Sequence, residues 1–222
     1  MTPTDQSVAA PVEPRFSAAL RAATWQDHEQ AESSSFMTAL MSGHLPIAGY
    51  AELAAQQWFV YAALEAAADT MRAHPVAGPF VSDDLTRLPT IEADLAFLLG
   101  ENWSHQITAR PATEAYVDRI RAVCFDEPGA FVAHHYTRYL GDLSGGQHIG
   151  RQVRTLYDLD TAGAAFFTFE RIASAKDFKD RYRTRLDDAP WTPTEQQAVI
   201  AEIRHAYRLN RDLFADLDAT IG

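Results

Sequence analysis

Apolar and polar residues along this chain recur at the three- and four-residue spacing of an α-helix, and no stretch alternates residue by residue as a half-buried strand does. Prolines and glycines fall between the periodic stretches, where they open and close helices. No repeat and no linker long enough to divide the chain is present. The pattern therefore predicts a single all-α domain over residues 15–222, after a disordered tail at 1–14. The predicted helices cover residues 13–42, 46 to the proline at 75, 89 to the glycine at 100, 111–123, a glycine-bearing segment after 129, 173–186, and 192–218, the last opened by a capping box at 192–195.

The glycine-bearing segment, A-H-H-Y-T-R-Y-L-G-D-L-S-G-G-Q-H-I-G-R at 133–151, has helical apolar spacing in spite of its glycines. Each glycine inside a helix costs about 1 kcal/mol relative to alanine. Either the backbone bends here, or something flat and bulky lies against it where a Cβ would clash. Gly141 and Gly145 share a helix face, with Gly146 following and Asp142 beside them. They form a strip without side chains that has one carboxylate at its edge.

The composition of the chain excludes several classes of function. The net charge of −11 argues against bulk binding to nucleic acid or to anionic membranes, so an anion site must be a local basic cluster. Cys124 is the only cysteine, which excludes an internal disulfide and a thiolate metal cage and fits a reduced, cytoplasmic setting. No apolar run has the length of a membrane span, and the first fourteen residues lack the features of a secretion signal.

One basic cluster stands out in this acidic chain. The segment K-D-F-K-D-R-Y-R-T-R begins at Lys176 and contains Lys179 and Arg183, which lie four residues apart and face the same way on a helix. Such a pair suits two carboxylates. The alternative is a solvated helix face whose cations pair with Asp177 and Asp180.

His28 is the first candidate metal ligand. Arg21, Trp25, His28 and Glu32 follow one face of the first predicted helix. A metal-binding imidazole needs an acceptor for its other ring nitrogen, and Glu32 is positioned for that role. The alternative is an ordinary surface histidine, since the chain has eight histidines.

The chain resembles the heme oxygenases from about residue 16 to residue 217. The resemblance rests on a gapless match to the family signature at Tyr136, Arg138, Gly141, Asp142, Gly145 and Gly146, and on a match to the family's proximal helix at His28, Ala31, Glu32, Phe36 and Met37. The segment A-F-F-T-F at 165–169 and the late positions Tyr207, Asn210 and Phe214 match as well, and their aromatic side chains are core or pocket wall.

The resemblance implies a multi-helical bundle that holds heme between a proximal helix and a glycine-kinked distal helix. His28 is then the axial ligand of the heme iron, with Glu32 behind it. The glycine strip is the distal wall, and Asp142 holds a water network that delivers a proton during oxygen activation. Arg138, Asn210 and Tyr116 join that network.

The same resemblance implies how heme is oriented. Lys179 and Arg183 bind the propionates, helped by Arg21 and by the hydroxyl of Tyr136. Met37 and Phe214 contact the macrocycle. Two departures affect this picture. Trp25 stands where many relatives carry a second basic residue, and Trp58 replaces a tyrosine that assists the distal network in some members.

The implied function is oxidative cleavage of heme b, both cofactor and substrate, to biliverdin, carbon monoxide and ferrous iron by O2. No nucleotide-binding glycine loop is present, so electrons come from a ferredoxin or an NAD(P)H-dependent reductase that docks near Lys179 and Arg183. The chain ends at Gly222 without a hydrophobic anchor, which suggests a soluble, bacterial-type cytoplasmic enzyme, a monomer or weak dimer with no nucleic acid or membrane as a partner.

Two other functions stay open: a heme-binding chaperone or sensor without turnover, and a helical bundle with a non-heme metal site. The second needs paired Glu-x-x-His motifs, and only Glu202 to His205 has that spacing. The role of His148 is open.

Overall fold

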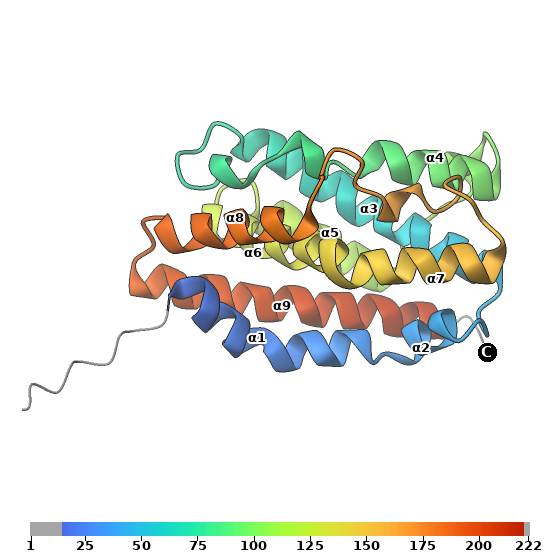
Figure 1. Ribbon diagram of the computed structural model, residues 1–222, viewed down its shortest axis with the longest axis horizontal. Helices are drawn as coiled ribbons and strands as arrows, with labels where there is room; N and C mark the ends of the chain where they lie inside the picture. Colours follow the sequence, from blue (N-terminus) through green and yellow to red (C-terminus); the bar gives the residue numbers. More distant parts are fainter. Residues whose placement is uncertain (1–14, 220–222) are drawn as a thin grey trace, which may run out of the picture.

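The computed structural model describes residues 15–219, except for the side chain of Glu32, and this part of the chain folds into helices and turns without a strand (Figure 1). The all-α prediction is confirmed, while the tail predicted at 1–14 lies outside the described residues. The α-helices are α1 (Phe16–Glu32), α2 (Ser35–Met41), α3 (Ile47–Met71), α4 (Leu88–Leu99), α5 (Pro111–Val123), α6 (Pro128–His135), α7 (Gln147–Tyr157), α8 (Ala175–Asp188) and α9 (Pro193–Asp218). None of these helices is long and apolar enough to cross a membrane.

The single helix predicted over 13–42 is wrong, because the chain breaks between α1 and α2. Ser34 has an extended backbone, and its hydroxyl accepts a hydrogen bond from the amide of Met37. A serine that caps the next helix satisfies an amide that would otherwise lack a partner, so the run of serines at 33–35 favours a new start over a continuation. The new start directs the buried side chains of Phe36 and Met37 into the bundle.

Other helix ends follow their local chemistry as predicted. Proline occupies the first turn of α4, α5, α6 and α9, where its missing amide proton is not needed. Gly100 ends α4 at a φ of +88°, a conformation that favours glycine. Thr192 and Glu195 form the predicted capping box at the start of α9.

Helix α9 is the centre of the packing and contacts α1, α2, α5 and α6 (Figure 1). Glu202 of α9 ties two of these neighbours together. It pairs with Arg119 of α5 at 2.6 Å and with His134 of α6 at 2.9 Å. These contacts hold α6 in place, and α6 leads directly into the glycine-bearing segment.

After α6 the backbone widens into two π-helical turns, Tyr136–Leu140 and Asp142–Gly146, before α7 resumes α-helical geometry. In a π-helical turn the backbone hydrogen bond joins residues five apart, in place of four apart as in an α-helix. Such turns frequently lie at functional sites. The glycine-bearing segment therefore departs from α-helical geometry by a local widening, whereas the two alternatives left open by the sequence were a bend and a flat ligand against the backbone.

Candidate functional site

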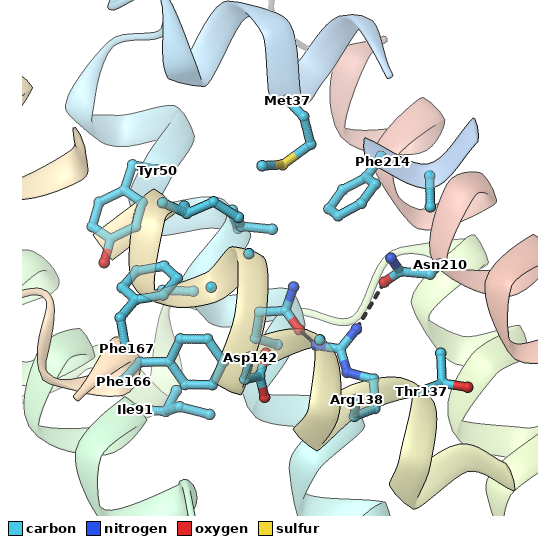
Figure 2. A pocket seen from close by; sticks show the side chains of 18 of the residues that line it. Met37, Tyr50, Ile91, Thr137, Arg138, Asp142, Phe166, Phe167, Asn210 and Phe214 are labelled. Carbon is cyan, nitrogen blue, oxygen red and sulfur yellow. Dashed lines mark hydrogen bonds between the residues drawn. The ribbon is translucent and has the colours of Figure 1, made fainter. Parts of the chain in front are cut away.

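A pocket opens between α1, α3, the π-helical segment and α9, and its close-up is drawn in Figure 2. Its lining is mostly apolar with a few polar side chains, as is usual for small-molecule and cofactor sites. Most predicted site residues line it: His28, Met37, Arg138, Gly141, Asp142, Gly145, Gly146, Asn210 and Phe214. Positions nearly two hundred residues apart in the sequence thus face one space.

His28 lies between two aromatic rings. Its imidazole stacks on Trp25 at a centroid distance of 5.9 Å and an interplanar angle of 9°, and it meets Tyr207 edge-on at 5.9 Å. On α1, the guanidinium carbon of Arg21 lies 5.8 Å from the centroid of Trp25. The predicted face of α1 is therefore present up to His28, and the side chain of Glu32 lies outside the described residues.

The glycines at 141 and 150 are bare for different reasons. A Cβ placed on Gly150 would lie 2.8 Å from Cγ of Phe167 and closer still to its Cβ, so this glycine is required by packing within the protein. A Cβ placed on Gly141 would meet no heavy atom within 4 Å. Packing of the chain itself does not require glycine at 141, although glycine costs about 1 kcal/mol there. The open space over Gly141 therefore suits a ligand that lies against the backbone.

This difference predicts opposite outcomes for two matched substitutions. Gly150→Ala is expected to lower the free energy of unfolding by about 1–3 kcal/mol, the usual cost of overpacking. Gly141→Ala is expected to leave it unchanged or raise it by up to about 1 kcal/mol, because alanine favours the helix. Urea denaturation measures both.

Heme affinity of Gly141→Ala, measured by absorbance titration, is expected to fall by about 1–3 kcal/mol of binding free energy. Unchanged heme affinity would contradict a ligand against the strip.

A polar network borders the strip. The hydroxyl of Tyr61 donates to Asp142. Arg138 donates to Oδ1 of Asn210 at 2.7 Å (Figure 2). It also donates to Gln57, and its guanidinium carbon lies 4.9 Å from the centroid of Tyr61. Burial raises the pKa of the Asp142 carboxyl above its ordinary value, although the charge of Arg138 opposes this shift. The site thus has a carboxyl group with raised proton affinity beside a buried cation.

Tyr116 also belongs to this region. It is fully buried on α5, and burial raises the pKa of its hydroxyl to about 12, against the opposing charge of Arg138. A hydroxyl with this pKa stays protonated at neutral pH and can serve as a hydrogen-bond donor.

The sequence interpretation missed Tyr61 and misplaced Trp58. The indole of Trp58 donates to Glu92 at 3.2 Å and packs on Trp103, and Trp58 does not line the pocket. Tyr61 supplies the hydroxyl beside Asp142 instead. Tyr61 lies four residues after Gln57 and therefore on the same face of α3. This spacing was the signal in the sequence that could have indicated that Tyr61 faces the site.

The predicted basic cluster lies beside the pocket and not in its lining, which includes none of Lys179, Arg183, Arg21 and Tyr136. Nζ of Lys179 lies 2.7 Å from Oγ of Ser144, which joins α8 to the π-helical segment. Partial burial and the nearby charges of Arg183 and Arg21 lower the pKa of Lys179. Burial also raises the pKa of Tyr136, whereas those two arginines oppose the increase. Cations gathered in this way favour an anionic ligand.

The alternative of a solvated helix face holds for Lys176, which pairs with Asp180 at 3.0 Å. Arg183 contacts the same carboxylate at 2.9 Å, but it also lines a surface depression with Arg21 and Trp25.

The non-heme metal alternative has no supporting geometry. Glu202 binds Arg119 and His134, while His205 lies 3.9 Å from it. Across residues 15–219 no three His, Cys, Asp or Glu side chains converge as a metal site, the unplaced Glu32 carboxylate aside. His148, whose role was open, is exposed and is not among the lining residues.

Comparisons with known proteins agree with this geometry. The family model of heme oxygenase matches residues 14–216. Heme oxygenase 1 of Homo sapiens is 41% identical over 205 residues, covering 91% of this chain and 71% of that protein. A heme oxygenase-1 structure from the cyanobacterium Synechocystis, in complex with heme, has a TM-score of 0.89 and 33% identity and covers 94% of both chains. The heme oxygenase structure from Leptospira interrogans has a TM-score of 0.86 and 32% identity, covering 91% of this chain and 99% of that one. The chain therefore belongs to the heme oxygenase family.

Proposed function

We propose that this chain binds heme b between His28 and the glycine strip and cleaves it with O2 to biliverdin, carbon monoxide and ferrous iron. Membership of the family makes it a heme-degrading enzyme. The observation that carries the finer proposal is the open space over Gly141, which faces the same pocket as the His28 imidazole. We also propose that residues 15–222 act as one domain.

Each group has a distinct task in this proposal. When bound, heme supplies a redox-active iron and is itself the molecule that is oxidised. His28 would bind the heme iron, and Trp25 and Tyr207 hold its ring on two flanks. The basic cluster beside the pocket would bind the propionates and would thereby fix the rotation of the macrocycle in its plane; it consists of Lys179, Arg183, Arg21 and Tyr136.

Asp142 has the proton-handling task. Its Oδ2 accepts a hydrogen bond from the hydroxyl of Tyr61. Its Oδ1 lies toward the glycine strip, 3.8 Å from the position that a Cβ of Gly146 would occupy. Oδ1 can therefore hold a water molecule over the bare backbone. A water molecule held by a carboxylate donates its proton less strongly than a direct acid or a cation would.

A heme-binding chaperone or sensor would share the pocket, so turnover has to be tested. The purified protein is mixed with hemin, an electron donor and O2, and absorbance is followed. We expect the heme absorption band to disappear as biliverdin forms. A stable heme complex that never loses this band under reducing conditions would favour the chaperone or sensor.

We propose that electrons arrive from an external acidic protein that docks on the exposed face of α8. Arg181 and Arg185 are exposed there and do not belong to the basic cluster that we assign to the propionates. Electrostatic steering changes association rates by about 10- to 1,000-fold. Arg181→Glu/Arg185→Glu is therefore expected to slow reduction by an acidic ferredoxin about tenfold at low salt, with heme affinity unchanged. Stopped-flow absorbance measures the rate.

Charge reversal of two exposed basic residues elsewhere, Arg121→Glu on α5 together with Arg208→Glu on α9, changes the net charge by the same amount and is the control. An equal effect of both changes, or no effect of either, would contradict docking on α8.

A further inference from the structure

The turn between α7 and α8 lines the pocket although it has little regular structure of its own. A single 3-10 turn, Ala165–Phe167, is present in it. Phe166 and Phe167 extend from this turn into the pocket, on the side opposite Asn210 and Phe214 (Figure 2). Something outside the turn must therefore hold these two rings in place.

Asp94 of α4 holds the amide side of the turn. Its Oδ1 accepts a hydrogen bond from the amide of Ala165 at 2.8 Å, and its Oδ2 accepts one from Phe166 at 2.8 Å. Asp94 is 1% exposed and itself lines the pocket. A buried carboxylate is costly unless its oxygens are hydrogen-bonded, and here both oxygens bind consecutive backbone amides.

Two further side chains hold the carbonyl side. Nη1 of Arg87 donates to the carbonyls of Phe166 at 3.0 Å and Thr168 at 2.7 Å. The hydroxyl of Tyr50 donates to the carbonyl of Gly163 at 2.8 Å. Buried side chains from α3 and the α4 region thus bind the turn on both its donor and its acceptor sides.

The two rings have little freedom on their other faces. Phe167 packs on the bare backbone of Gly150, and Phe166 meets Tyr61 edge-on at 5.4 Å. Tyr61 is the residue that donates to Asp142. The turn therefore contacts both the pocket and the ring that carries the proton-handling hydroxyl.

We propose that Asp94 is a specificity-determining positioning residue, which fixes Phe166 and Phe167 as a rigid wall so that the pocket accepts a porphyrin in one in-plane orientation. This inference rests on the proposed function for its consequence, namely which edge of the macrocycle is opened. The basic cluster of Lys179, Arg183 and Arg21 would hold the propionate side of the ring, and the wall of Phe166 and Phe167 would limit the ring within the pocket. With the wall loosened, more than one meso edge can face the strip.

Asp94→Asn tests this inference because asparagine has the same shape but places an NH2 group against one of the two amides. In the heme-free protein, hydrogen exchange at the Ala165 and Phe166 amides is expected to quicken about tenfold, as befits the loss of one hydrogen bond. Iron-free protoporphyrin is expected to bind with an altered induced circular dichroism, which reports its orientation. With hemin and reductant, a mixture of biliverdin isomers is expected in place of one dominant isomer.

Glu92→Gln, exposed on the same helix, is the matched control and is expected to behave as the parent protein. If Asp94→Asn does not fold, Tyr50→Phe removes a single hydrogen bond to the same turn and is expected to produce the same changes more weakly. Unchanged circular dichroism of bound protoporphyrin, or an unchanged isomer pattern at lower yield, would overturn the inference. A parent protein that forms no biliverdin would refute the proposed function instead, and the protoporphyrin measurement would still decide the role of Asp94.

Discussion

His28→Ala is expected to lower the rate of biliverdin formation by at least about 100-fold, because loss even of a group that only supports a metal ligand costs about 10- to 100-fold. Heme is still expected to bind, since the walls of the pocket and the basic cluster beside it remain. The absorption spectrum of the complex should lose the features of imidazole-ligated iron. The ring of His28 fills the space between Trp25 and Tyr207, so its removal leaves a cavity of matching shape.

That cavity provides a direct test of the assignment. Added imidazole is expected to enter it and to restore the ligated spectrum and part of the rate. His148→Ala is the matched control, because this histidine is exposed and does not line the pocket. Native activity of His28→Ala without added imidazole would show that another group binds the iron.

Most helices could be predicted from the sequence because their ends are set by local chemistry. Pro111 and Thr192 open helices, and Gly100 closes one, through groups that lie within the same turn. The break at Ser34 was missed, since its apolar neighbours continue the helical spacing on both sides. Choosing between one helix and two there depends on where Phe36 and Met37 can be buried, and that is a property of the whole bundle.

The candidate site also has parts that local sequence predicts and parts that depend on distant residues. The glycine strip and Asp142 were visible because they break the pattern of a helix within a few residues. The wall formed by Phe166 and Phe167 was left open as either core or pocket wall, with core the safer assumption, because aromatic residues in a short segment are usually core. Its role depends on Asp94, more than seventy residues earlier in the chain, whose hydrogen bonds to the turn no local pattern encodes.

Asp142→Ala is expected to leave heme bound with an imidazole-ligated spectrum but to lower biliverdin formation by about 10²- to 10⁴-fold, the usual contribution of a positioned proton-handling group. The alanine variant loses both the acceptor for the Tyr61 hydroxyl and the oxygen that faces the strip. Oxidising equivalents should then be spent on other reactions, so oxidation of an added phenol is expected to rise as biliverdin falls. Product analysis by absorbance and chromatography measures both.

Asp142→Asn separates charge from shape. Burial raises the pKa of Asp142, so in the parent protein the carboxyl loses its proton at a higher pH than an ordinary aspartate. If the carboxylate holds the water molecule, the parent rate rises with pH through that pKa, and the asparagine variant lacks this step. Tyr61→Phe keeps the ring and removes only the hydroxyl, and it is expected to lower the rate less than Asp142→Ala. An unchanged biliverdin yield in Asp142→Ala would reject the proton-handling role, because the strip and His28 alone would then suffice for turnover.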